Sequence, residues 1–183
     1  MIKEKQINLK KQIFTALLAC MGYVLNTFVW FPRMAPFQHF INVLASVFLG
    51  PFWSFVCALL IGLLRMMLNG SSILAVIGAV VGAFLSGILY KKFQKLYWAV
   101  IDRKSTRLKS WAVIGEVVGT GIISAIISYP FMRIFYGLPK TSVFTYVPFF
   151  VPASFMGSML AVLLLKTLEK TGTFNKLKSM LDN

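Results

Sequence analysis

Long apolar runs separated by short polar breaks make up most of the chain. Each break contains residues that end or begin a helix: the prolines of "WFPRMAPFQ", the pair Gly50 and Pro51, the "NGSS" turn at 69–72, and Pro130. Glycine often follows the last turn of a helix, and proline suits the first turn of the next one. The pattern predicts helices over about 12–30, 38–49, 52–68, 73–90, 110–129 and 143–168.

The apolar content decides the class of protein. Of the 183 residues, 58% are hydrophobic and only 13% are charged, whereas a soluble domain usually carries about 25% charged residues. A helix needs about 20 mostly apolar residues to cross a bilayer, and most of the predicted helices approach that length. We therefore predict an all-α integral membrane protein of the cell membrane, in which residues 1–183 form a single multi-pass domain with six transmembrane helices.

The basic residues indicate how these helices are oriented. The net charge is +14, and most of the 19 lysines and arginines lie before the first apolar run, in the connection 91–109 and after residue 165. A six-helix path puts these three segments on one side, and an excess of Lys and Arg marks the cytoplasmic side. We expect both termini and a basic loop over 91–109 to be cytoplasmic. Topology and attraction to anionic membrane lipid explain the charge, so no nucleic-acid partner is predicted.

Polar side chains within the apolar runs share one depth, near the outer ends of the helices. Such groups are costly in hydrocarbon and usually face the interior of a bundle or a water-filled cavity. The group comprises Gln38, His39 and Asn42 in the second helix, Arg65 and Ser72 around the end of the third, and Ser128 and Tyr129 in the fifth. These groups could simply hydrogen bond to one another between packed helices. For Gln38, His39, Asn42 and Arg65 together we favour an outward-opening ligand pocket.

Catalysis is poorly supported by the residues. The chain has one histidine, His39, and we expect Glu116 near the cytoplasmic end of the fifth helix, on the opposite half of the membrane. These two residues would then be too far apart for a nucleophile–base–orienter arrangement. Cys20 and Cys57 lack the spacing of metal ligands. We predict no catalytic residues, no metal and no bound cofactor, and a structural partner for Glu116.

Several stretches resemble a known family. They are "PFQHFINVLASVFLGPFW", "IGLLRMML", "GAVVGAFLSGILY", "GEVVGTGIISAIISYP" and "VPASFMGSMLAVLLLK". Together with six predicted helices in fewer than 200 residues, they resemble the substrate-binding S components of energy-coupling factor (ECF) vitamin transporters. Within that group they are similar to the ThiW family, the S component for the thiazole precursor of thiamine.

The resemblance implies a subunit that captures hydroxyethylthiazole and docks on a transmembrane T subunit. Two partner ATPase subunits would hydrolyse the ATP. S components commonly contact the T subunit through small residues four apart on the first helix, and the matching positions here are Thr15, Ala16, Ala19 and Cys20. Small residues let helices approach closely within a membrane.

The chemistry of a thiazole suggests a role for each candidate residue. A flat ring stacks on aromatic side chains such as Trp30, Phe37 or Tyr129. Its nitrogen and its hydroxyethyl group need hydrogen-bond partners, which Gln38, His39, Asn42 and Ser128 can provide. Arg65 leaves two interpretations open: it binds a phosphate or carboxylate of the ligand, or it ties the first loop to the third helix.

Other functions remain open at this point. The same architecture suits a different ligand, such as hydroxymethylpyrimidine, thiamine or another small vitamin. A further alternative is a small autonomous carrier or a membrane enzyme.

Overall fold

The computed structural model describes residues 2–29, 31, 34–100 and 107–182. Over these ranges the chain is helical, apart from connections and one isolated bridge between Phe31 and Met34. The elements are α1 (Ile2–Phe28), α2 (Pro36–Leu49), α3 (Pro51–Asn69), α4 (Leu74–Val100), α5 (Arg107–Val118), the π-helical turn η1 (Gly119–Ser124), α6 (Ala125–Tyr136), α7 (Val147–Lys170) and α8 (Thr173–Asp182). The segments α5, η1 and α6 follow without a break and form one long rod. The predicted all-α class is confirmed for the described residues.

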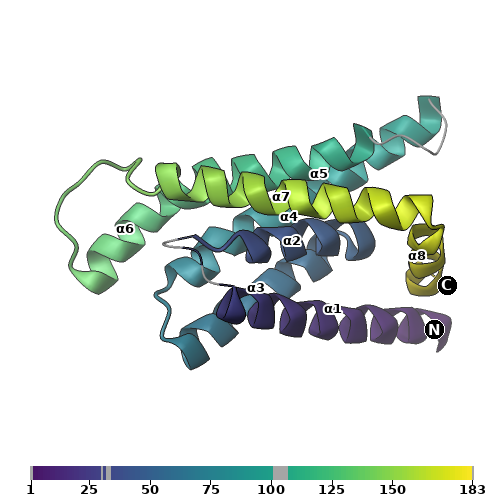
Figure 1. Cartoon of the computed structure of the whole chain (residues 1–183), viewed down its shortest axis with the longest axis horizontal. Coiled ribbons are helices and arrows are strands. Elements are labelled where there is room, and N and C mark those ends of the chain that lie inside the picture. Colours follow the sequence, from purple (N-terminus) through teal and green to yellow (C-terminus); the bar gives the residue numbers. More distant parts are fainter. Residues whose placement is uncertain (1, 30, 32–33, 101–106, 183) are drawn as a thin grey trace.

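Helix α2 lies in the middle of the bundle, between α1 and α7 (Figure 1). Its residues 41–49 are all buried. The N- and C-termini lie at the same end of the molecule (Figure 1), where Lys11 Nζ is 3.5 Å from Asp182 Oδ1. Helix α2 is therefore the central element that the other helices surround.

Four helices within the described residues are long and apolar enough to cross a membrane. They are Pro51–Asn69, Leu74–Leu96, Lys109–Tyr136 and Val147–Lys170. Helix α2 has 14 residues, which extend about 21 Å at 1.5 Å per residue, against a hydrocarbon core of about 30 Å. A multi-pass protein agrees with these lengths, while six crossings and cytoplasmic termini remain predictions.

Two predicted boundaries on the basic side are wrong. Helix α4 continues to Val100 instead of ending at Tyr90, so much of the predicted loop 91–109 is helical, and α1 begins at Ile2 rather than at residue 12. The predicted helices end where the apolar runs end. However, Lys, Gln, Glu and Leu are good helix formers, so a helix continues beyond its apolar part. The chain also forms α8, which the sequence did not predict, and its Leu181 is 5% exposed.

The fifth predicted helix does not end before Pro130. Helix α6 includes Pro130 and ends at Tyr136, where Gly137 adopts the left-handed φ of 62° that closes a helix. Transmembrane helices tolerate proline because neighbouring groups and local π-helical turns accommodate the freed carbonyl, and η1 lies one turn before it. Helix α7 likewise begins at Val147, four residues after the predicted start.

Glycines bring α4 close to the α5–η1 rod. A Cβ atom on Gly119 would lie 2.7 Å from the Cα atom of Gly82, and one on Gly115 would lie 2.5 Å from Ser86 Cα. Only glycine permits backbones to approach this closely. Gly115 and Gly119 are four apart and so share one face of their helix, which is the face that packs against α4.

Candidate ligand-binding site

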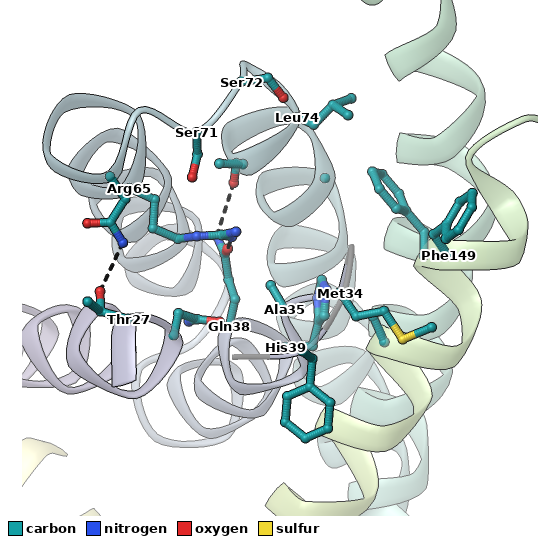
Figure 2. A pocket seen from close by; sticks show the side chains of 17 residues that line it. Thr27, Met34, Ala35, Gln38, His39, Arg65, Ser71, Ser72, Leu74 and Phe149 are labelled. Carbon is teal, nitrogen blue, oxygen red and sulfur yellow. Dashed lines mark hydrogen bonds between the residues drawn. The ribbon is translucent and has the colours of Figure 1, made fainter. Parts of the chain in front are cut away.

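A cavity of about 440 Å³ lies at the end of the bundle away from both termini. Residues from α1, α2, α3, α4 and α7 and from their connections line it: Asn26, Thr27, Phe31, Met34, Ala35, Gln38, His39, Arg65, Asn69, Ser71, Ser72, Leu74, Ala75, Gly78, Phe149, Phe150 and Ala153. Figure 2 shows Arg65 on one side of this cavity and Phe149 on the other, with His39 between α2 and α7. The lining is thus polar on one side and aromatic on the other.

Helix α2 is bound to α4 by a ladder of hydrogen bonds. The bonds run from Gln38 Nε2 to Ala75 O (3.1 Å), from Asn42 Nδ2 to Ala79 O (3.1 Å) and from Ser46 Oγ to Ala83 O (3.0 Å). The donors are one turn apart on α2, and the acceptors are alanines one turn apart on α4. Residues four apart share a helix face, and alanine leaves room for a neighbouring helix. The ladder fixes the first turn of α2, and with it the cavity wall.

Glu116 lies directly behind this wall. Its Oε1 is 2.8 Å from His39 Nδ1, and it accepts hydrogen bonds from Asn42 Nδ2 (2.9 Å) and Thr120 Oγ1 (3.1 Å). Glu116 is fully buried, and His39 is 6% exposed. The expectation that Glu116 lies far in depth from His39 is therefore wrong. Helix α2 is too short to start at the outer surface, and Glu116 lies seven residues, about two turns, inside a 28-residue span.

The pair supplies only part of a catalytic arrangement. A carboxylate that holds a histidine is the orienter–base half of a triad. Among the described residues, His39 makes no hydrogen bond to a serine, threonine or cysteine that could act as the nucleophile. No group of three or more His, Cys, Asp or Glu side chains in the described ranges could hold a metal ion. The arrangement can hold and orient a ligand.

Among the described residues that line the cavity, Arg65 is the one cationic side chain. Its Nη1 donates to Gln38 Oε1, while Gln38 donates in turn to α4 (Figure 2). No aspartate or glutamate is among the lining residues of the described chain. A guanidinium has five N–H donors, so further donors remain for a ligand after the bond to Gln38. The alternative interpretation expected Arg65 to tie the first loop to the third helix; within the described residues, Arg65 instead ties α3 to α2.

The aromatic side of the cavity comes from the start of α7. Phe149 and Phe150 both line it, and the ring of Phe150 would lie 3.1 Å from a Cβ atom on Gly78. The absence of a side chain at Gly78 therefore makes room for the Phe150 ring. Aromatic rings beside polar donors are typical of sites that bind flat, modestly polar molecules.

The comparisons with known proteins give the family. A family model described as "Thiamine-precursor transporter protein (ThiW)" matches residues 12–104 and 101–171, which cover most of the chain. The chain belongs to the ThiW family. It is accordingly a multi-pass membrane protein from a family of transporters, as the resemblance predicted. No curated protein and no solved structure matches it.

Only some of the predicted ligand residues of this ThiW protein line the cavity. Gln38, His39, Arg65 and Ser72 do so. The lining does not include Asn42, Phe37, Ser128 or Tyr129. Asn42 and Ser128 are fully buried, while Phe37 packs against Phe31 and Phe40. The predicted stacking residue Trp30 lies outside the described residues.

Four residues of the site region were not predicted from the sequence. They are Glu116 and Ser46, which hold α2 in place, and the aromatic pair Phe149 and Phe150 on α7. Glu116 was assigned to a different depth, and Ser46 was not recognised as the continuation of Gln38 and Asn42. A signal for Ser46 was available, because all three polar residues recur at a spacing of four. Phe149 and Phe150 stand among many other phenylalanines, and nothing in the sequence separates them.

The predicted partner face of α1 divides into two parts. Thr15 and Ala19 are 2% exposed and pack inside the chain itself, where Thr15 O accepts from Cys57 Sγ at 3.8 Å. Ala16 and Cys20 are exposed. Of the four predicted contact residues, only this second pair is accessible to another subunit.

Proposed function

We propose that this ThiW-family chain captures hydroxyethylthiazole in the cavity beside Arg65 and His39, as the S component of an ECF importer. The cavity carries the proposal. Its volume of about 440 Å³ falls within the range of roughly 300–1,000 Å³ that is usual for small-molecule sites. Its lining combines Phe149 and Phe150 with polar side chains from three helices, and a substituted thiazole has the matching combination of a flat ring and a short polar arm.

Transport would require energy from other subunits. In this proposal a T subunit docks on the exposed small residues Ala16 and Cys20 of α1, and two ATPase subunits hydrolyse the ATP. The chain itself needs no cofactor. Clusters of lysine near the termini favour contact with anionic lipid on the cytoplasmic side, which is the side on which the ATPases would act.

Arg65 supports a second candidate, a phosphorylated form of the same thiazole. A guanidinium with no acidic residue among the described lining groups is suited to bind a phosphate through two parallel hydrogen bonds. Hydroxymethylpyrimidine and thiamine are further ligands that fit a polar and aromatic cavity.

Direct binding to the purified chain in lipid nanodiscs distinguishes these ligands. The panel consists of hydroxyethylthiazole, its phosphate ester, hydroxymethylpyrimidine and thiamine, measured by calorimetry. We expect hydroxyethylthiazole to bind most tightly, and Arg65→Met to weaken it about tenfold, which corresponds to one lost charged hydrogen bond. Arg133→Met is the matched control, because Arg133 is exposed and is not among the lining residues. Tighter binding of the phosphate ester, with the advantage lost in Arg65→Met, would establish the second candidate instead.

The role of the partners is tested by uptake in cells. Uptake of hydroxyethylthiazole should stop when the partner ATPase is disabled, and uptake that continues would point to an autonomous carrier. Ala16→Leu should lower uptake without lowering ligand affinity, because it blocks close approach to α1. Met21→Leu is the control, since Met21 is already large and exposed on the same helix.

A further inference from the structure

His39 stands between the cavity and a buried carboxylate. It is one of the residues that line the cavity, and its Nδ1 is 2.8 Å from Glu116 Oε1. His39 is 6% exposed and Glu116 is fully buried. The two ring nitrogens of a histidine have different roles, and the partner of one decides what the other can do. The hydrogen bond between Nδ1 and Glu116 therefore influences whether Nε2 of His39 donates or accepts a hydrogen bond.

The contacts of Glu116 Oε1 bear on which ring nitrogen of His39 carries a proton. Asn42 Nδ2 and Thr120 Oγ1 both donate to Oε1, the same oxygen that contacts His39. Asn42 Nδ2 can only donate, and an ionised carboxylate oxygen can accept from all three neighbours. With Glu116 ionised, Oε1 accepts from all three groups and Nδ1 of His39 carries a proton.

The second nitrogen, Nε2, then becomes an acceptor. When Nδ1–H donates to a carboxylate and Nε2 is unprotonated, the neutral histidine has a lone pair on Nε2, as in the serine-protease triad. Nε2 has no hydrogen-bond partner among the described residues. The hydroxyls of Ser71 and Ser72 can donate or accept, and Arg65 can only donate. Nε2 is a lining atom that can then only accept, as can the amide oxygen of Asn26, whose Nδ2 donates to Gly22 O.

We propose that His39 Nε2 accepts the hydrogen bond of the ligand's hydroxyl group and that Glu116 is the positioning residue that makes it an acceptor. This inference rests on the proposed function, because it identifies which part of hydroxyethylthiazole the site recognises. It predicts that the site discriminates against the ethyl analogue, which differs only in lacking the hydroxyl. A site built to bind a hydroxyl rejects a molecule without one, because the buried partner is left unpaired.

The first test needs no ligand. His39 is the only histidine, so a chain labelled with 15N-histidine gives signals from one imidazole. At neutral pH we expect Nδ1 to be protonated and Nε2 to be unprotonated. Glu116→Gln keeps an acceptor oxygen and should retain this tautomer, whereas Glu116→Leu removes the acceptor and should shift the proton to Nε2. A wild-type ring protonated on Nε2, or on both nitrogens, would overturn the proposal.

The second test measures the contribution of the hydroxyl. The wild type should bind hydroxyethylthiazole about tenfold more tightly than the ethyl analogue, the equivalent of one hydrogen bond. His39→Asn should reduce this ratio to about one, because the asparagine amide can donate to Glu116 in place of Nδ1 but leaves no group at the position of Nε2. Thr120→Val is the control. It removes another donor to the same oxygen, leaves His39 in place and should keep the tenfold ratio.

The outcomes separate this inference from the proposed function. If hydroxyethylthiazole does not bind at all, the proposed ligand and the hydroxyl contact both fail. If it binds and the ratio survives in His39→Asn, the inference alone is overturned. Glu116→Leu could fail to fold, and the wild-type spectrum together with the His39→Asn ratio decides the proposal without it.

Discussion

The two ends of the bundle each contain a cavity, and the larger one is the less suited to a ligand. The second cavity, of about 570 Å³, lies at the end with the termini. It is lined by the charged residues Lys11, Lys91, Lys109, Lys178, Glu169 and Asp182, among others. It is therefore both larger and more basic than the cavity beside Arg65.

The cations of the second cavity are nearly all engaged within the chain. Lys109 forms an ion pair with Glu169, and Lys11 Nζ lies 3.5 Å from Asp182. Lys178 Nζ donates to the backbone carbonyls of residues 47 and 48, both at 3.0 Å. These are among the last carbonyls of α2, which have no partner within their own helix, and a cation near a helix C-terminus is favourable. The charged residues of the basic cavity therefore have a structural role: Lys178 caps the C-terminal end of the short helix α2.

The contrast shows that spare hydrogen-bonding capacity, rather than size or charge, distinguishes a binding site. Beside Arg65 and His39, donors and an acceptor remain after the internal bonds are counted, whereas around Lys178 the bonds are used to hold α2. One ladder connects both ends, because Gln38 lines the first cavity and Ser46 lines the second.

The largest effect should follow from Gly157→Ala, which acts at the ligand end. A Cβ atom there would lie 2.1 Å from Pro36 O and 2.8 Å from Phe40 N, so the first turn of α2 would have to move. We expect the free energy of unfolding to fall by about 3 kcal/mol or more and ligand binding to be lost, as measured by thermal unfolding and calorimetry. Ser158→Ala, at the next position, should change stability by less than about 1 kcal/mol. Wild-type stability and affinity in Gly157→Ala would show that the two helices do not pack this closely.

A smaller effect is expected from Asn42→Ala, in the middle of the ladder. Asn42 donates to both Ala79 O and Glu116, so its loss should cost about 2 kcal/mol of stability. Affinity should change less than threefold or so, because Asn42 is not among the lining residues. A large loss of affinity at unchanged stability would restore the ligand contact that the sequence predicted for Asn42.

Ser46→Ala is the matched variant at the other end of the ladder. Ala83 O accepts from both Ser46 Oγ and Ser54 Oγ at 3.0 Å. Because Ser54 still bonds to this carbonyl after the substitution, we expect a cost of only about 1 kcal/mol. Equal costs for the two variants would mean that Glu116 contributes nothing to the role of Asn42.

These residues also show how far the sequence could be interpreted. Polar residues in an apolar run placed Gln38, His39, Arg65 and Ser72 around one cavity, since burial in a membrane limits where such groups can go. The same reasoning failed for Glu116, because depth was counted from predicted helix ends. The true ends depend on helix propensity beyond the apolar run and on a proline accommodated within α6. Helix propensity is a local property of the residues, whereas the accommodated proline and the pairing of α2 with α4 depend on tertiary contacts.

At the terminal end, Lys178→Met should lower stability by about 1 kcal/mol, through lost hydrogen bonds to the end of α2. The side chain is partly exposed at 26%, which limits the effect. Ligand affinity should be unchanged, because Lys178 lies in the other cavity. Lys176→Met, an exposed neighbour on α8, is the control and should leave stability unaltered. A change in ligand affinity with unchanged stability would make the basic cavity part of the binding site.

The smallest expected effect is a pH dependence of the stability difference between wild type and Lys178→Met. Burial lowers the pKa of Lys178 below the ordinary 10.5, Lys11 and Lys91 lower it further, and Asp182 opposes them. Between the lowered pKa and 10.5 the unfolded chain binds more protons than the folded chain, so the contribution of Lys178 to stability rises with pH. A neutral amine still has two N–H groups for the two carbonyls. The stability difference between wild type and Lys178→Met should therefore grow as the pH rises toward 10.5. A difference that shrinks with pH would mean that the bonds to α2 require the charged amine.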